Sequence, residues 1–137
     1  FEISSINESM DISDFDISFI KGLSLEDGCA TLTEFTAYLI SEGLKKVDQI
    51  NNIKTENYFL CGGGRKNKIL IKKIFQQMND NQLVIRDIDE FKINGDFIEA
   101  QAFAYLAVRC VLNLPISFPN TTRCTKSSSG GEIVKNF

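Results

Sequence analysis

The chain has 137 residues, of which 43% are hydrophobic and 24% charged, and its formal net charge is -3. This length suits a single domain, which we expect to bury roughly two thirds of its surface around a core of its own. The small charge gives no electrostatic basis for nucleic-acid binding, and no apolar run reaches the ~18 residues of a membrane span.

The first sixteen residues are acidic, with five carboxylates and no basic residue, and the chain starts at Phe1 rather than at a methionine. We expect residues 1–20 to form an acidic leader at the cut end of a longer chain. A disordered acidic tail is the alternative, although Ile3, Ile6 and Phe15 give more apolar content than such tails usually have. Residues 21–137 are the predicted domain.

Residues 24–47 form the first predicted helix, because apolar and small positions recur there at spacings of three and four. Ser24 followed by Asp27 indicates a capping box at its start. Lys45 and Lys46 suit the negative end of the helix dipole at its finish. A polar connection follows over residues 48–57.

Residues 58–85 contain a strand, a helix and a second strand. Tyr58 to Cys61 reads as a short buried strand that includes Cys61, residues 67–78 as an amphipathic helix, and Leu83 to Ile85 as the next strand. Two strands joined through a helix should pair in parallel with a right-handed crossover. We therefore predict an α/β fold, with a mixed sheet and helices on both of its faces.

The turn after the first strand carries the clearest functional signal, Gly62, Gly63 and Gly64, followed by Asn67. Three residues without Cβ permit positive φ and close approach of a ligand to the backbone, and the next helix aims its free N–H groups at the gap. This geometry suits a nucleotide. A glycine-rich turn can also serve only to reverse the chain.

A basic cluster begins directly after these glycines. We expect its members to form the solvent-exposed face of the helix, while the first two could help to attract a polyphosphate; they are Arg65, Lys66, Lys68, Lys72 and Lys73.

Residues 96–113 form the most apolar predicted helix, which we expect to be central and covered on most sides, with Leu114-Pro115 ending it. Asp89 and Glu90 precede it as turn residues without an assigned role. The tail after Pro119 is rich in turn-forming residues, and Ile133-Val134 could be a last short strand.

Four cysteines, at positions 29, 61, 110 and 124, form no CxxC pair, and the chain contains no histidine. This excludes zinc sites of the usual spacing and catalysis by Cys-His or Ser-His-Asp groups. The sequence thus predicts no metal site, reduced thiols and a cytoplasmic location.

The order strand, Gly62-Gly63-Gly64, Asn67 is neither the Rossmann fingerprint nor a P-loop. It resembles the adenosine motif of the actin, Hsp70 and sugar-kinase superfamily. Together with Asp96-x-x-Glu99-Ala100-x-Ala102-Phe103-Ala104-x-Leu106-Ala107 and Leu114-Pro115-x-x-x-Pro119, it closely resembles the C-terminal part of anhydro-N-acetylmuramic acid kinase, from about residue 22 onward.

This resemblance implies part of an actin-like, ribonuclease H-like lobe, with residues 21–137 as a C-terminal nucleotide-binding lobe. It implies a cell-wall recycling enzyme that uses MgATP to convert 1,6-anhydro-N-acetylmuramic acid into N-acetylmuramic acid 6-phosphate. By the same resemblance, Gly62, Gly63, Gly64 and Asn67 contact ATP, and Glu99 faces the amino sugar. Alternatively, Asp96 and Glu99 are only a capping box.

Three family motifs are missing from this sequence: the N-terminal glycine-rich phosphate loop, the Asp-Thr-Gly-Pro-Gly-Asn segment and the aspartate that activates water. We therefore expect no catalytic residue here and no activity from the chain alone. The expected partner is the missing N-terminal part, or a separately encoded half, and a homodimer is a further expectation. The alternatives are a non-catalytic nucleotide-binding or protein-interaction module and a decayed remnant.

Overall fold

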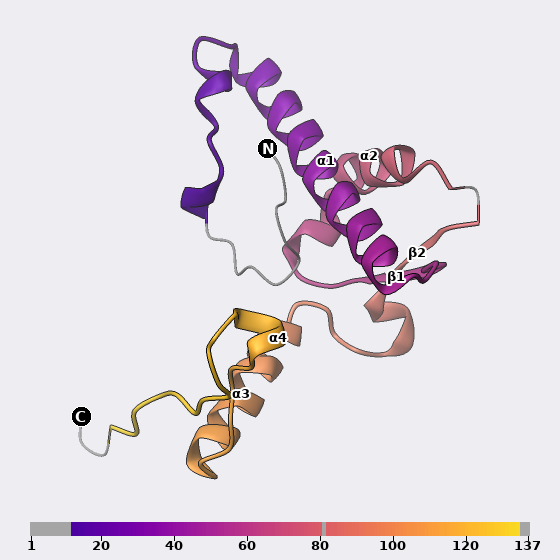
Figure 1. Ribbon diagram of the computed structural model, residues 1–137. Helices are drawn as coiled ribbons and strands as arrows, with labels where there is room; N and C mark the ends of the chain where they lie inside the picture. The colour runs from indigo at the N-terminus through magenta and orange to yellow at the C-terminus, as the bar shows by residue number, and fades with distance from the viewer. Residues whose placement is uncertain (1–11, 81, 135–137) are drawn as a thin grey trace.

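The computed structural model describes residues 12–80 and 82–134 (Figure 1). The longer elements are three helices, α1 (Leu25–Asn51), α2 (Lys68–Met78) and α3 (Ile98–Val111), and two strands, β1 (Asn57–Leu60) and β2 (Val84–Asp87). Short helical turns lie between them, namely η1 (Ile12–Asp14), η2 (Ser18–Ile20), η3 (Gly63–Lys66), η4 (Ile88–Phe91) and α4 (Pro119–Thr122). The fold is therefore α/β.

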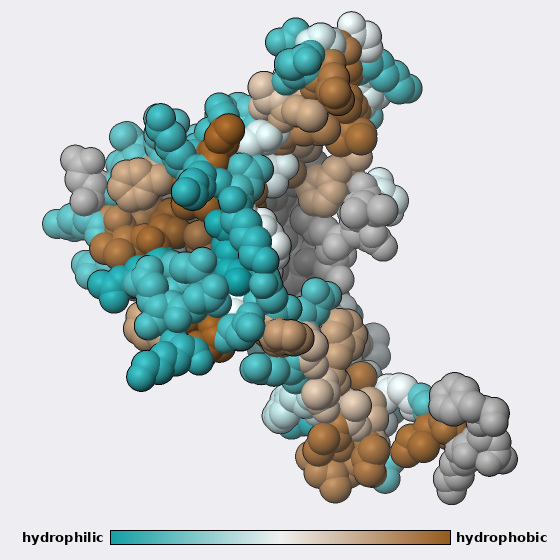
Figure 2. Space-filling view, turned by 180° about the vertical axis from the view of Figure 1, so that it is seen from behind, coloured by the Kyte–Doolittle hydropathy of each residue, from teal (hydrophilic) through white to brown (hydrophobic). Residues whose placement is uncertain are grey.

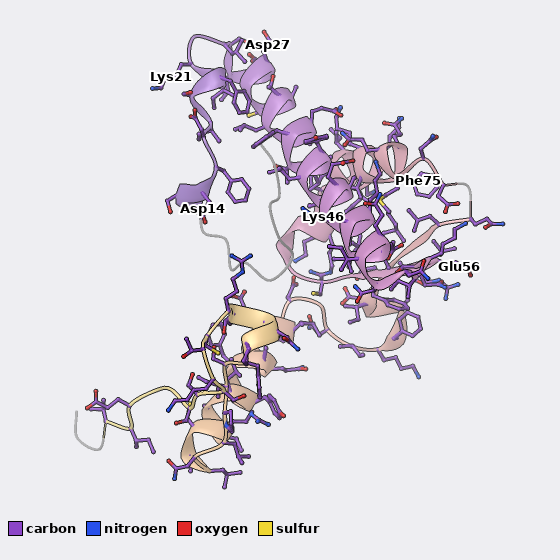
Figure 3. All side chains as sticks on the ribbon, viewed as in Figure 1. Asp14, Lys21, Asp27, Lys46, Glu56 and Phe75 are labelled. Atoms are coloured by element: carbon purple, nitrogen blue, oxygen red, sulfur yellow. The ribbon has the colours of Figure 1, made fainter. Side chains whose placement is uncertain are left out.

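Helix α1 begins where the sequence predicts, because Ser24 caps it. The Ser24 hydroxyl accepts the backbone N–H of Asp27 at 3.1 Å and donates to its carboxylate at 2.9 Å. The predicted end at Val47 is wrong. Lys46 lies within the helix (Figure 3), which stops at Asn51 because Asn52 turns into the left-handed region at φ 51°.

Strands β1 and β2 pair in parallel, with Asn57 opposite Val84 and Leu60 opposite Asp87, which confirms the predicted strand, helix, strand unit. The predicted mixed sheet is not found in the described segments, where the sheet consists of these two parallel strands. Ile133 and Val134 form no strand. Any further strand would have to come from outside these segments.

The small core lies where α1 crosses α2. Ala37 and Ser41 of α1 have no exposed surface, and Ile74 of α2 is 4% exposed. The Ser41 hydroxyl donates to the carbonyl oxygen of Ile74 at 3.4 Å. Two small side chains one helical turn apart thus let the two helices approach closely.

Helix α3 and the segment after it form a second part, drawn apart from α1, α2 and the sheet in Figure 1. α3 contacts the chain segment that follows it. The Arg109 Nε donates to the carbonyl of Pro115 at 2.7 Å, and the Cys110 thiol donates to the carbonyl of Gly130. None of its residues is buried. The prediction that α3 is a covered central helix is thus wrong for this chain.

The molecule leaves much apolar surface open. Its accessible area is 10478 Å², against roughly 7200 Å² for a compact protein of this mass. Figure 2 shows hydrophobic patches over both parts, and the buried apolar residues among those described are Ala37, Ile74 and Leu83. The expected self-sufficient core is therefore not observed. None of the helices in residues 12–80 and 82–134 is long and apolar enough to cross a membrane.

Candidate functional site

The glycine turn has the open backbone that a ligand site requires. Gly62 adopts φ 75° and ψ 177°, a region that essentially only glycine occupies, whereas Gly63 and Gly64 have negative φ and begin η3. A Cβ built on any of the three would meet no atom within 4 Å. The predicted positive φ is therefore confirmed at Gly62 alone, and the backbone of the whole turn is open.

Asn67 opens α2, as the sequence predicts. Its side-chain oxygen accepts the backbone N–H of Leu70 at 3.1 Å, which is the bond of an N-cap residue. Cys61, by contrast, lies after the end of β1 and is exposed, so its prediction as a buried strand residue is wrong. The backbone leaves the strand there because the Gly62 N–H donates to the carbonyl of Gly95 at 2.9 Å.

Arg65 is not part of the exposed basic face. Its side chain is only 4% exposed, and its guanidinium contacts three carboxylates, at 3.2 Å to Asp87, 2.9 Å to Asp89 and 2.5 Å to Asp96. These carboxylates balance its charge, so Arg65 is no longer available to attract a polyphosphate. Lys66, which is 63% exposed, shares Asp96 at 2.7 Å.

The cluster keeps its groups charged. Hydrogen bonds from Arg65 and then Lys66 lower the pKa of Asp96 to about 2. The backbone N–H of Gly95, followed by Arg65, lowers the pKa of Asp89, and the bonds to Asp96 and Asp89 raise the pKa of Arg65 further. Asp96, Asp89 and Arg65 are therefore ionised at neutral pH.

Gly95 completes this cluster, although the sequence predicts no role for it. It is buried, and a Cβ there would lie 2.8 Å from the Nε of Arg65 and 3.0 Å from the Cγ2 of Ile88. The turn pattern Asn94-Gly95-Asp96 is the only local signal that could have suggested it. The role of Asp89 was also missed, because its partners lie 6 and 24 residues away.

Glu99 is exposed in the first turn of α3, and its side chain has no hydrogen bond or ion pair within the described part of the chain. The capping-box alternative is wrong. The residue before α3 is Phe97, which makes no side-chain cap, and the carboxylate of Asp96 binds Arg65 and Lys66 instead. The structure thus brings the glycine turn to Asp96, two residues before α3 begins.

An apolar groove of about 610 Å³ lies beside the turn, between α2 and the strands. Ile71 and Phe75 of α2 line it together with Val84 and Ile85 of β2, and Arg65, Lys68, Lys72 and Asp87 add charged groups. Within residues 12–80 and 82–134, no group of three or more carboxylates or cysteines could hold a metal ion.

Comparison with protein families matches residues 11–136 to the family described as anhydro-N-acetylmuramic acid kinase. Three proteins of this name are similar to the chain. That of Pelagibacter ubique (strain HTCC1062) is 49% identical over 94% of the chain, that of Zymomonas mobilis subsp. mobilis 40% over 92%, and that of Phenylobacterium zucineum 36% over 93%. The alignments cover 34%, 33% and 33% of those proteins, so the chain spans about a third of their length.

Proposed function

The chain belongs to the anhydro-N-acetylmuramic acid kinase family, and from this premise we propose that it is the C-terminal part of an ATP-dependent kinase. The whole enzyme converts 1,6-anhydro-N-acetylmuramic acid into N-acetylmuramic acid 6-phosphate, in the cytoplasm, during peptidoglycan recycling. The match over residues 11–136 carries this proposal. The open glycine turn at its expected place supports it.

ATP fits the turn formed by Gly62, Gly63 and Gly64. Their backbone carries no side chain, and no atom lies within 4 Å of where a Cβ would stand, so the nucleotide can approach the main chain. Asn67 caps α2 three residues after Gly64, and the first turn of a helix offers free N–H groups to an anion. These residues bind and orient the nucleotide.

Mg²⁺ enters this proposal as a part of MgATP. The cation would offset the phosphate charge, and its ligands would come mostly from the two thirds of the enzyme outside this chain. The same holds for the aspartate that activates water. Since a general base contributes roughly 10²- to 10⁴-fold to the rate, the chain alone is expected to be inactive.

Glu99 is the candidate contact to the amino sugar. An ionised carboxylate is an acceptor with two oxygens, which suits the hydroxyl and amide N–H groups of such a ligand. The side chain is exposed at the head of α3 and is not occupied by any neighbour within the described residues. It is therefore free to serve a ligand.

The test joins this chain to the N-terminal two thirds of the Pelagibacter ubique relative, and we call the product the assembled enzyme. ATP-dependent formation of the 6-phosphate is measured by mass spectrometry. Glu99→Gln should lower kcat/KM for the sugar ten-fold or more, which is about 1.4 kcal/mol, at an unchanged melting temperature. Glu90→Gln, also exposed, is the control. Full activity of Glu99→Gln would remove Glu99 from the site.

The extensive exposed apolar surface also fits a second function, that of a non-catalytic nucleotide-binding or protein-interaction module. The same experiment separates the two. An assembled enzyme that binds ATP but forms no phosphorylated sugar would favour the module, whereas turnover favours the kinase.

A further inference from the structure

We propose that Arg65 is a positioning residue that clamps the glycine turn to the start of α3, so that both move as one unit. The hydrogen bonds that form the clamp all lie within this chain. Its consequence for catalysis rests on the proposed function, because it assumes that the turn holds ATP and that α3 presents Glu99 to the sugar.

The first observation is the origin of the four acceptors around the guanidinium. Three of them are carboxylates: Asp87 ends β2, Asp89 lies in η4 and Asp96 precedes α3. The fourth is the carbonyl of Gly62, which accepts at 2.9 Å from the Arg65 Nη1 atom that also donates to Asp96. Four acceptors from four segments use the planar, five-donor fork that only arginine provides. A lysine could not hold all of them at once.

The second observation concerns the Gly62 peptide, which is held on both sides. Its N–H donates to the Gly95 carbonyl at 2.9 Å, and its own carbonyl accepts from Arg65. The Gly95 N–H donates to the Asp89 carboxylate at 2.6 Å, and the same carboxylate accepts a hydrogen bond from Arg65. These bonds form a closed ring, so the positive φ of Gly62 is supported by groups from the segment before α3.

The third observation is the space at Gly95. The Nε of Arg65 would lie 2.8 Å from a Cβ there, closer than side-chain atoms pack, so the buried guanidinium lies against bare backbone. A glycine at position 95, whose φ is negative, is thus explained by the clamp rather than by its own backbone conformation.

The mechanical consequence follows from the arrangement in Figure 1, where the part that contains α3 extends away from the sheet. Gly62, Arg65 and Lys66 bond to Gly95 and Asp96 directly before that part. A nucleotide that orders the turn would therefore also order the head of α3, which carries Glu99. The ATP and sugar sites are coupled through Arg65.

The clamp is tested on the full 137-residue chain by amide hydrogen exchange followed by NMR. Arg65→Gln should speed exchange at the Gly62 and Gly95 amides ten-fold or more and leave Ser41, in the α1–α2 core, unchanged. Gly95→Ala should speed exchange at the Gly62 amide in the same way without removing a charge. The exchange rate of Gly62 in Arg65→Lys should lie between those of the unchanged chain and Arg65→Gln. Lys72→Gln, which removes one positive charge from the exposed face of α2 outside the clamp, is the control and should leave exchange at Gly62 and Gly95 unchanged.

Equal exchange at Gly62 in the chain and in Arg65→Gln would overturn the clamp, as would exchange at the free-peptide rate in the unchanged chain. If Arg65→Gln fails to fold, the exchange rates of Arg65→Lys and Gly95→Ala decide.

In the assembled enzyme, Arg65→Lys should raise KM for ATP and for the sugar together, whereas Glu99→Gln should raise only the KM for the sugar. An inactive assembled enzyme would contradict the proposed function and leave the exchange result standing.

Discussion

At the scale of single residues, the three glycines of the turn are not equivalent. Gly62 occupies a backbone region closed to other residues, whereas Gly63 and Gly64 have negative φ and free space around them. Glycine is therefore needed at position 62 for the fold. At positions 63 and 64, only an approaching ligand would require it.

Alanine substitutions separate these two requirements. Gly62→Ala should cost about 1–3 kcal/mol in the free energy of unfolding, because of the strained backbone, whereas Gly63→Ala should stay within about 0.5 kcal/mol. Urea unfolding measures both. If ATP lies on the turn, Gly63→Ala should nevertheless weaken ATP binding by calorimetry in the assembled enzyme. Unchanged affinity in Gly63→Ala would place the nucleotide elsewhere.

Protonation of Asp96 should weaken the clamp at low pH. Its pKa in the folded chain is about 2, below the ordinary value of 3.8, because Arg65 and Lys66 stabilise the charged form. A carboxylate whose pKa is lower in the folded than in the unfolded chain stabilises the fold at pH values above the unfolded-state pKa. This stabilisation is lost as the pH falls through the folded-state pKa. The clamp should thus be intact at neutral pH and weaken between about pH 4 and pH 2.

The measurement is the melting temperature against pH for the chain and for Asp96→Asn. The gap between the two curves should be constant above about pH 5 and should narrow toward pH 2. Glu132→Gln, an exposed carboxylate in the tail, is the control and should run parallel to the unchanged chain. A gap that stays constant down to pH 2 would contradict the ion pair.

At the scale of elements, the contact between α1 and α2 depends on small side chains. Ala37 and Ser41 leave the space into which Ile74 packs, and Glu34 binds Lys73 and Gln77 at the edge of the same contact. This contact holds the helix that begins at Asn67 and thereby supports the turn before it.

A larger side chain at this contact should separate the helices. Ala37→Leu should destabilise the chain by about 1–3 kcal/mol through overpacking, and Ile74→Ala by about 2–5 kcal/mol through the cavity that it leaves. Ala30→Leu, at an exposed position of α1, is the matched control and should have little effect. Urea unfolding checks all three, and a neutral Ala37→Leu would refute this packing.

At the scale of the whole molecule, the dominant feature is unburied apolar surface. Parallel sheets are normally covered on both faces, yet here two parallel strands stand with an open apolar groove of about 610 Å³ beside them. Along α3, Phe103, Tyr105 and Val111 are 64%, 60% and 62% exposed. The chain spans about a third of the length of the relatives it matches, and we expect the rest of such an enzyme to cover these surfaces.

Covering of the groove is the expected result of assembly. The chain alone should bind the dye ANS, and addition of the N-terminal two thirds of the Pelagibacter ubique relative should reduce dye binding and raise the melting temperature. Phe75→Glu, in the groove, should weaken this association ten-fold or more. Leu25→Glu, which is 78% exposed at the start of α1, is the control. Equal association of both variants would exclude the groove from the interface.

Local signals in the sequence were sufficient for several features. The cap at Ser24, the start of a helix at about Asn67, the positive φ at Gly62 and the parallel pairing of the two strands were all predicted and confirmed. Each depends on residues close together in the chain, since capping bonds span three residues and a helix between two strands favours parallel pairing. The family resemblance also came from such short motifs.

Only the tertiary structure decided the rest. Arg65 lies in a run of basic residues and reads as exposed, yet partners 22, 24 and 31 residues away bury it. The same bonds take Asp96 away from the predicted capping box and explain Gly95. Periodicity marks which face of a helix is apolar but not what covers it, so α3 reads as central and yet lies open here. Local patterns thus determined the elements and the turn, whereas contacts between distant residues determined which charges are paired and which surfaces remain open.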